Sequence, residues 1–376
     1  MNKIVFTGGG TGGHIFPGLA VVDELRRING ARDIAWIGSS SGIDRSIVEG
    51  HGISLYGIPT GKLRRYASWR NLTDMFRILA GFFAALRLLS KLKPTLVFSK
   101  GGFVSVPPCF AARVLGIPVI THECDFSPGL ATRINSRSAE SIFVSYGETK
   151  KAFPERLKKK ITVTGNPVRS VFYSASAAKG RVFLGCPDSD LPVLLILGGS
   201  LGARQVNDMV LSSLNALCSR FIVVHQTGPE NADQVASADA SIPPGRYKAY
   251  PFIKAEMPDV LAAASLVIAR SGANTVWECA ASGKPMVLVP LEKGSSRGDQ
   301  VENARYFVSR GAAVMLTGTE ATGERLAETV LRLAESEKLL ADMASNSAAL
   351  GASRPAELIA SMVEKRAAEI ERGKAR

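Results

Sequence analysis

The sequence predicts an α/β protein of two Rossmann-like domains that face each other across a cleft, each with a parallel sheet covered by helices. Short apolar segments alternate with amphipathic helical stretches along most of the chain. Two of these segments, residues 3–6 and 192–197, are each followed by a glycine-rich loop and a helix. A chain of 376 residues is also too long for one ordinary core and suits two domains.

The first domain is predicted to open with a strand over residues 3–6 and a glycine loop over residues 8–14. A helix over residues 17–27 follows, with Pro17 in its first turn. The alternation then continues through apolar runs at residues 33–37, 95–99, 118–121 and 141–145.

The pattern restarts after a polar stretch rich in alanine and serine at residues 170–179, where we place the linker. A strand is predicted over residues 192–197, a second glycine loop over 198–203 and one helix over 205–217. We therefore expect three parts along the chain, namely an N-terminal domain over 1–165, a C-terminal domain over 166–350, and a last helix within 351–376 that packs back on the N-terminal domain.

Positive charge is concentrated in two stretches of a chain whose formal net charge is +13. Residues 61–100 contain nine Lys or Arg residues and one acidic residue, a net charge of +8. Residues 150–160 contain six Lys or Arg residues and one acidic residue, a net charge of +5, so the two stretches together account for the net charge of +13. A local basic surface fits nucleic acid, an anionic membrane or a phosphorylated substrate as partner.

No segment of the sequence is typical of a membrane span or a signal peptide. The longest apolar run, residues 78–89, is shorter than a bilayer requires and is interrupted by Arg87. The apolar segment over residues 4–6 is too short to be the hydrophobic region of a signal peptide. The five cysteines are scattered, without metal or redox spacing. We expect a cytoplasmic protein with reduced cysteines.

The loop at residues 8–14, Gly-Gly-Gly-Thr-Gly-Gly-His, is the strongest local signal. Gly8, Gly10 and Gly13 fit the spacing at which backbone N–H groups approach a diphosphate at a helix N-terminus, although a tight turn could also require them. The second predicted strand ends without the acid that binds a dinucleotide ribose, so NAD is disfavoured. His14 stands where the helix dipole favours a neutral imidazole that can accept a substrate proton; a capping or core role is the alternative.

Further candidate residues follow strand ends in the second domain. Ser271 or Asn274 could cap a helix whose first N–H groups bind an anion, with Glu278 accepting sugar hydroxyls. Asp299 and Gln300 stand at another loop–helix junction and offer more hydroxyl ligands. A plain capped surface helix is the alternative in both cases.

His122 and Glu123 also follow a predicted strand and could form an acid–base pair. They could equally begin a metal site, but the spacing supplies no third ligand. The Asp-Ser-Asp at residues 188–190 resembles the motif of metal-dependent sugar transferases, yet its place before a strand favours a turn. No metal is therefore predicted.

Residues 72–92 have apolar side chains at helical spacing, with most of the Arg and Lys residues on another side. This helix either packs on its domain as an ordinary surface helix or lies in a membrane interface. Phe82 and Phe83 together present more apolar surface than one packing stripe needs, which keeps the membrane alternative open.

Motifs that span nearly the whole chain resemble one enzyme family. They are the glycine loop extended through residue 20, Ser-Lys-Gly-Gly-Phe at 99–103, Gly-Asn-Pro-Val-Arg at 165–169, Gly-Gly-Ser-Leu-Gly-Ala at 198–203 and Arg-Ser-Gly-Ala at 270–273. In this order they are similar to the peptidoglycan N-acetylglucosaminyltransferases of the GT-B fold class.

The resemblance implies an inverting glycosyltransferase that needs no metal or other cofactor. It would move N-acetylglucosamine from UDP-N-acetylglucosamine to the C4 hydroxyl of undecaprenyl-pyrophosphoryl-N-acetylmuramoyl-pentapeptide, which converts lipid I to lipid II. It also implies a peripheral protein on the cytoplasmic side of the inner membrane, bound to its anionic surface. Other cell-wall synthesis proteins are further candidate partners, and nucleic acid is not.

The resemblance assigns site residues as well. His14 is implied as the general base, with Glu123 as a second candidate. The predicted contacts with UDP-N-acetylglucosamine are Thr11, Gly12, Gly13, Asp125, Asn166, Arg169, Ser200, Ile253, Ala273, Asn274, Thr275, Val276, Trp277, Glu278 and Gln300. Many members of the family read His-Glu-Gln-Asn where this chain reads His-Glu-Cys-Asp at residues 122–125, so Asp125 stands where an asparagine is usual.

Two alternatives stay open at this point. A related GT-B glycolipid synthase would use another UDP-sugar and another lipid acceptor, and the motif at residues 99–103 with His122 and Glu123 argues against it. A non-catalytic protein could use the basic stretches to bind lipid or nucleic acid, and the glycine loops in both halves argue against that.

Overall fold

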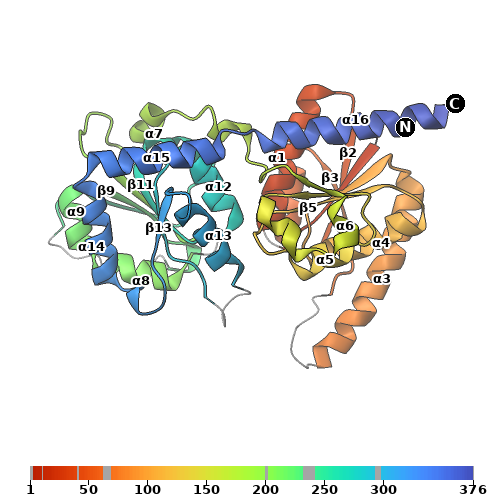
Figure 1. The fold of residues 1–376 in the computed structure, drawn as a ribbon, viewed down its shortest axis with the longest axis horizontal. Coiled ribbons are helices and arrows are strands. Elements are labelled where there is room, and N and C mark those ends of the chain that lie inside the picture. Colours follow the sequence, from red (N-terminus) through yellow and green to blue (C-terminus); the bar gives the residue numbers. More distant parts are fainter. Residues whose placement is uncertain are drawn as a thin grey trace. The chain divides into compact units, whose positions relative to one another are not determined.

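The computed structural model describes residues 3–10, 12–39, 42–61, 69–199, 202–231, 242–292 and 298–375. The chain divides into two compact units. Unit 1 consists of Met1–Arg169 and Arg354–Arg376, and unit 2 of Ser170–Ser353. Each unit is built on a parallel sheet with helices packed on both faces (Figure 1). The predicted α/β class with two Rossmann-like parts is confirmed.

Unit 1 contains a parallel sheet in the order β3-β2-β1-β4-β5-β6-β7. Its strands are β1 (Lys3–Thr7), β2 (Asp33–Ser39), β3 (Ser54–Ile58), β4 (Leu96–Ser99), β5 (Val119–Glu123), β6 (Ser141–Val144) and β7 (Ile161–Val163). Its helices are α1 (Gly12–Ile28), α2 (Gly42–Gly50), α3 (Trp69–Leu92), α4 (Val106–Val114), α5 (Leu130–Asn135), α6 (Glu155–Lys158) and α16 (Pro355–Ala375), with the 3-10 turns η1 (Phe103–Ser105) and η2 (Gly147–Ala152). Because the strands are parallel, the loops that follow them meet at the carboxyl edge of the sheet.

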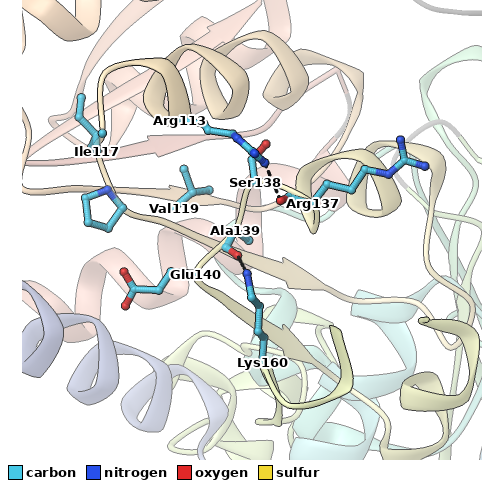
Figure 2. A pocket seen from close by; sticks show the side chains of 10 residues that line it. Arg113, Ile117, Val119, Arg137, Ser138, Ala139, Glu140 and Lys160 are labelled. Atoms are coloured by element: carbon cyan, nitrogen blue, oxygen red, sulfur yellow. Dashed lines mark hydrogen bonds between the residues drawn. The ribbon is translucent and has the colours of Figure 1, made fainter. Parts of the chain in front are cut away.

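A pocket of about 420 Å³ opens at the opposite, amino edge of this sheet (Figure 2). It lies where β5 and β6 begin. Arg113 donates from Nη1 to the carbonyl oxygen of Arg137 at 2.9 Å, and Lys160 donates from Nζ to that of Ala139 at 2.8 Å. None of the predicted site residues lines this pocket, so the candidate site has to be sought at the other edge.

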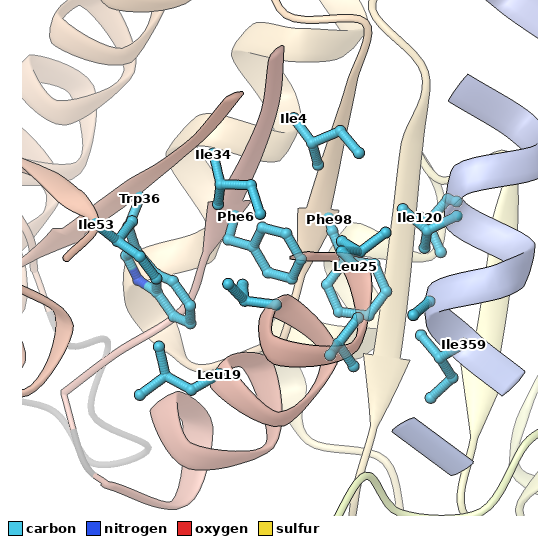
Figure 3. Packing of buried hydrophobic residues seen from close by; sticks show 14 of the residues in the cluster. Ile4, Phe6, Leu19, Leu25, Ile34, Trp36, Ile53, Phe98, Ile120 and Ile359 are labelled. Atoms are coloured by element: carbon cyan, nitrogen blue, oxygen red, sulfur yellow. The ribbon is translucent and has the colours of Figure 1, made fainter. Parts of the chain in front are cut away.

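The two faces of the unit 1 sheet carry separate apolar cores, because neighbouring strand residues point to opposite sides. On the face covered by α1 and α16, the Phe6 ring stacks on Trp36 and makes a tilted contact with Phe98, with ring centroids 5.7 and 5.1 Å apart (Figure 3). Val5 and Val97 belong to the core on the face of α3 and α4. The large side chains on both faces are fully buried, and each such burial stabilises the unit by about 2 kcal/mol.

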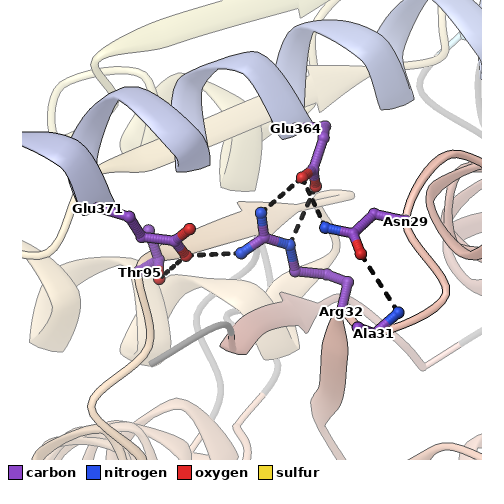
Figure 4. Close-up of polar contacts among 6 residues, drawn as sticks. All are labelled: Asn29, Ala31, Arg32, Thr95, Glu364 and Glu371. Atoms are coloured by element: carbon purple, nitrogen blue, oxygen red, sulfur yellow. Dashed lines mark hydrogen bonds and ion pairs between the residues drawn. The ribbon is translucent and has the colours of Figure 1, made fainter.

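The C-terminal helix α16 packs on α1 and is held by a buried guanidinium (Figure 4). The side chain of Arg32 is 2% exposed and contacts Glu364 and Glu371, each at 2.6 Å. Burial alone would raise the pKa of Glu364, but hydrogen bonds from Arg32 and Asn29 lower it below its ordinary value of 4.5. The stabilisation from Glu364 is therefore complete above about pH 4.5 and is lost as the pH falls further.

Unit 2 contains a parallel sheet in the order β10-β9-β8-β11-β12-β13. Its strands are β8 (Val193–Leu197), β9 (Ile222–Gln226), β10 (Tyr247–Tyr250), β11 (Ala264–Ala269), β12 (Met286–Leu288) and β13 (Ala313–Met315). Its helices are α7 (Ala177–Phe183), α8 (Arg204–Ser212), α9 (Leu214–Arg220), α11 (Met257–Ala263), α12 (Ala273–Ala281), α13 (Asp299–Val308), α14 (Gly323–Ala334) and α15 (Glu337–Gly351), with the 3-10 turns η3 (Ser170–Phe172), η4 (Pro229–Asn231) and η5 (Gly318–Glu320).

Two helix predictions were wrong in their limits. Helix α1 begins at Gly12, so Pro17 is an interior residue and not part of the first turn. The helix predicted over residues 205–217 is two helices, α8 and α9, which meet at Ser213. The Ser213 hydroxyl donates to the carbonyl oxygens of Met209 and Val210, and this local bond competes with a continuous helix.

We expect Arg32→Ala to lower the free energy of unfolding by about 2 kcal/mol, because it removes a buried guanidinium and leaves two partly buried carboxylates, 16% and 26% exposed, without their cation. Arg366→Ala is the matched control, since Arg366 pairs with Glu140 at a side-chain exposure of 38%. We expect Arg366→Ala to lower the free energy of unfolding by less than about 1 kcal/mol. Urea denaturation measures both, and equal losses would contradict the role assigned to the buried pair.

Candidate active site

The glycine loop after β1 is held from the side by a carboxylate that the sequence did not reveal. Asp44, in the first turn of α2, is 2% exposed. Its two oxygens accept the Gly10 N–H at 3.0 and 3.1 Å, and one of them also accepts the Ser39 N–H at 3.3 Å. The Gly10 N–H therefore points at Asp44 rather than at a ligand phosphate.

Close packing also explains why glycine occupies this loop. Gly10 has φ +85°, and a Cβ atom there would lie 2.6 Å from Cε1 of Phe103. The Gly8 carbonyl oxygen accepts the indole N–H of Trp36 at 2.9 Å. The tight-turn explanation of these glycines is thus correct for Gly10, beside any part that the loop has in phosphate binding.

His14 is the third residue of α1 and is half-buried. Its Nδ1 lies 3.2 Å from the carbonyl oxygen of Lys100, the residue that follows β4. A carbonyl oxygen only accepts, so Nδ1 carries the proton and Nε2 carries the lone pair in the neutral ring. Gly101 and Gly102 (φ +80° and +75°) surround the ring closely; a Cβ atom on Gly102 would lie 2.9 Å from Cδ2 of His14.

The side chains of His122 and Glu123, at the end of β5, both form hydrogen bonds with backbone groups of neighbouring loops. Glu123 is 5% exposed, and its oxygens accept the N–H groups of Asp125 at 3.1 Å and Gly129 at 2.9 Å. His122 is fully buried with Nε2 at 3.0 Å from the Gly165 carbonyl oxygen. Burial, together with the nearby Lys100, holds the pKa of His122 well below its ordinary range. These residues hold the loops after β5 and β7 in place.

The other predicted residues of unit 1 lie at the same edge. Asn166 is fully buried in the loop after β7, and Asp125 is half-buried. The guanidinium of Arg169 lies over the ring of Phe16, 5.4 Å from its centroid. Two further predicted contacts, Thr11 in this unit and Ser200 in unit 2, lie outside the described residues.

In unit 2 the helix α12 follows β11, and its N-cap residue is Gly272. The prediction that Ser271 or Asn274 caps this helix was wrong. Asn274 lies inside α12, and the Ser271 hydroxyl donates to the Gln300 carbonyl oxygen at 2.8 Å because α13 begins beside it. A glycine N-cap has no side chain that competes with an anion for the first N–H groups.

Arg270 adds a buried positive charge at the base of α12. It is 8% exposed and donates from Nη1 to Gln205 Oε1 at 3.0 Å and to the Val289 carbonyl oxygen at 2.8 Å. Burial lowers its pKa from the ordinary value. In the part of the chain that the structure describes, no carboxylate contributes to the pKa shift of Arg270, so this strand end favours an anionic ligand.

Only some of the predicted side chains on α12 can reach a ligand. Val276 is fully buried and Trp277 is 5% exposed, packed against Phe307 at 5.3 Å between ring centroids. These two side chains belong to the core, and the Val276 N–H donates to the Gly272 carbonyl oxygen at 3.2 Å. Asn274, Thr275 and Glu278 are half-buried, whereas Ala273 is buried.

Two glutamines shape the remaining loops of this edge. The Ile253 N–H donates to Gln226 Oε1 at 3.0 Å, and the Leu291 N–H donates to Gln300 Oε1 at 3.0 Å. Ile253 itself is 2% exposed. Gln226 was not singled out from the sequence, because a lone glutamine at a strand end has no local signature.

Among the described residues, no group of three or more His, Cys, Asp and Glu side chains is arranged to hold a metal ion. Residues 188–190 lie in the turn and loop before β8.

Comparison with known proteins agrees with this geometry. The chain matches the glycosyltransferase family 28 N-terminal domain over residues 4–144 and the C-terminal domain of the same family over residues 193–360. It is 52% identical to the UDP-N-acetylglucosamine–N-acetylmuramyl-(pentapeptide) pyrophosphoryl-undecaprenol N-acetylglucosamine transferase of Treponema denticola, over 97% of each chain. It is 39% identical to the transferase of that name from Shouchella clausii, over 99% of this chain and 100% of that one.

Among solved structures, MurG from Acinetobacter baumannii superposes with a TM-score of 0.74 at 27% identity, over 97% of this chain and 100% of that one. The fold is thus the GT-B fold of these enzymes. The chain belongs to glycosyltransferase family 28, in the branch of the N-acetylglucosamine transferases named above.

We expect Gly102→Ala to reduce glycosyl transfer by about a hundredfold, because the new methyl group would lie 2.8 Å from the Gly9 carbonyl oxygen and 2.9 Å from Cδ2 of His14, and so displaces the glycine loop and the imidazole from their positions. Gly116→Ala is the matched control: its φ of +66° imposes similar backbone strain, but nothing lies within 4 Å of the added atom. Steady-state assays and thermal midpoints of both variants test this. A similar loss of turnover in the control would show that strain alone is responsible.

Proposed function

We propose that this protein transfers N-acetylglucosamine from UDP-N-acetylglucosamine to the C4 hydroxyl of undecaprenyl-pyrophosphoryl-N-acetylmuramoyl-pentapeptide, which converts lipid I to lipid II. The observation that carries the proposal is the 52% identity, over 97% of both chains, to a transferase named for this reaction. The His14 imidazole in unit 1 and the N-terminus of α12 with Arg270 in unit 2 support it.

In the proposed reaction the C4 oxygen of the acceptor attacks the anomeric carbon of the donor sugar from the face opposite UDP. A new carbon–oxygen bond forms while the bond to the β-phosphate breaks, which inverts the anomeric configuration. The electron pair leaves with UDP. Negative charge develops on the diphosphate, and the N-terminus of α12 with Arg270 favours it there.

His14 is the proposed base that takes the proton from the acceptor hydroxyl. Its Nδ1 is committed to the Lys100 carbonyl oxygen, which makes Nε2 the proton acceptor. Glu123 was the second candidate. Both of its oxygens already accept backbone N–H groups, so we assign it the role of holding the loop over residues 125–129.

We also propose that unit 1 binds the anionic cytoplasmic face of the inner membrane through α3 and α4. Their exposed apolar side chains, each more than half exposed, are Met75, Phe76, Leu79, Phe83, Phe110 and Val114. The ring of Phe82 on α3 contacts that of Phe110 on α4, which joins the two helices, and it also contacts the ring of Phe83. Arg77, whose side chain is 66% exposed on α3, would face lipid headgroups. In the described part of the chain, every helix is too short or too polar to span a bilayer.

The test of the function is transfer of labelled sugar from UDP-N-acetylglucosamine to a lipid I analogue. We expect His14→Gln to lower kcat by about a hundredfold or more while UDP binding, measured by calorimetry, stays within error. His51→Gln is the matched control, because Nδ1 of His51 also contacts a backbone carbonyl oxygen, that of Ile47 at 3.0 Å. Near-normal turnover in His14→Gln would remove His14 from the mechanism. Transfer to another lipid acceptor alone would favour a different glycolipid synthase.

For the membrane face, we expect the double variant Leu79→Glu/Phe83→Glu to weaken binding to vesicles that contain phosphatidylglycerol by more than about tenfold, since each side chain loses about 2 kcal/mol of apolar burial. Val182→Glu is the control, because Val182 is 66% exposed in unit 2. Vesicle co-sedimentation measures binding, and thermal midpoints verify folding. Equal binding by both variants would place the lipid contact elsewhere.

A further inference from the structure

Lys100 is a buried lysine at the centre of the unit 1 edge. The residue is 1% exposed, and it follows β4 directly. Its Nζ lies 2.7 Å from Nδ1 of His122 and 2.8 Å from Sγ of Cys124. Nothing in the mechanism above uses this side chain.

The positive charge of Lys100 has no carboxylate partner among the described residues. His122 donates from Nε2 to the Gly165 carbonyl oxygen, so its Nδ1 is an acceptor and its ring is neutral. Burial raises the pKa of the Cys124 thiol to about 11, which leaves the sulfur uncharged as well. The carboxylate of the intervening Glu123 is taken by backbone N–H groups.

A buried ion without an opposite charge costs stability, and a hydrophobic side chain of similar size is often at least as good. Fold stability therefore does not explain why a lysine stands at this position. Function is the better explanation, because residues that break a general rule of burial concentrate at functional sites.

The contacts of Lys100 show what that function requires. Its carbonyl oxygen fixes the His14 ring, its N–H donates to the Thr7 carbonyl oxygen at 2.8 Å, and its Nζ holds His122. His122 in turn holds Gly165. One residue thus connects the loops that follow β1, β5 and β7.

We propose that Lys100 is a positioning residue for sugar transfer: its Nζ, bound to His122 and Cys124, anchors the backbone whose carbonyl oxygen fixes the orientation and tautomer of His14. The proposal rests on the function proposed above. Cys124 and His122 serve it as neutral acceptors that hold Nζ in place.

The test is Lys100→Met, which keeps the length and apolar stem of the side chain and removes the ammonium. We expect kcat to fall by about tenfold to a hundredfold, with the KM for UDP-N-acetylglucosamine unchanged. The thermal midpoint should stay within about 3 °C of wild type, because the lost hydrogen bonds are offset by relief of the buried charge. Lys365→Met, at an exposed position on α16, is the matched control.

A second readout does not depend on turnover. The chain has four histidines, so ¹H–¹⁵N correlation spectra of the imidazoles are simple to assign by single variants. We expect one tautomer of His14, protonated on Nδ1, in the wild type and a mixture of tautomers in Lys100→Met. If the wild type transfers no sugar, the proposed function fails while the spectra still test the positioning of His14.

Normal kcat in Lys100→Met, or a single unchanged His14 tautomer, would overturn the proposal. Loss of folded protein in parallel with loss of activity would also overturn it, since Lys100 would then be a structural residue only.

Discussion

The parallel arrangement of the strands is the constraint on which the rest of this structure depends. In both units the paired strands run in the same direction, so the loops after the strands gather at one edge of each sheet. His14 and Lys100 are 86 positions apart in the sequence, yet they meet because β1 and β4 are neighbours. The chemistry of unit 1 is a consequence of this strand order.

Backbone groups orient most of the polar side chains at this edge. Asp44 and Glu123 place buried carboxylates on N–H groups, and His14 and His122 direct ring nitrogens to carbonyl oxygens. Each of these bonds settles an orientation, and the carbonyl partners of the two histidines also settle which ring nitrogen carries the proton, because a carbonyl oxygen can only accept. The edge can therefore hold one imidazole as a proton acceptor while the neighbouring acidic groups remain occupied.

The two units carry different polar groups at their carboxyl edges. Unit 1 offers the proposed proton acceptor His14 beside the buried Lys100, whereas unit 2 offers a helix N-terminus and the buried Arg270. Positive groups in both units suit a reaction in which the donor and the acceptor each bring a diphosphate. A protein of this kind can bind and stabilise such charge with fixed dipoles and cations of its own.

The sequence by itself determined the α/β class, the two glycine loops and the family, because these depend on local periodicity and on residue types at short spacing. Tertiary structure decided the details of the site. Only the fold brings Asp44 to Gly10, turns Ser271 toward α13 instead of capping α12, and places Lys100 beside His122 and Cys124. Local patterns do not encode these contacts, since they join residues that are far apart in the chain or depend on the direction in which a buried side chain points.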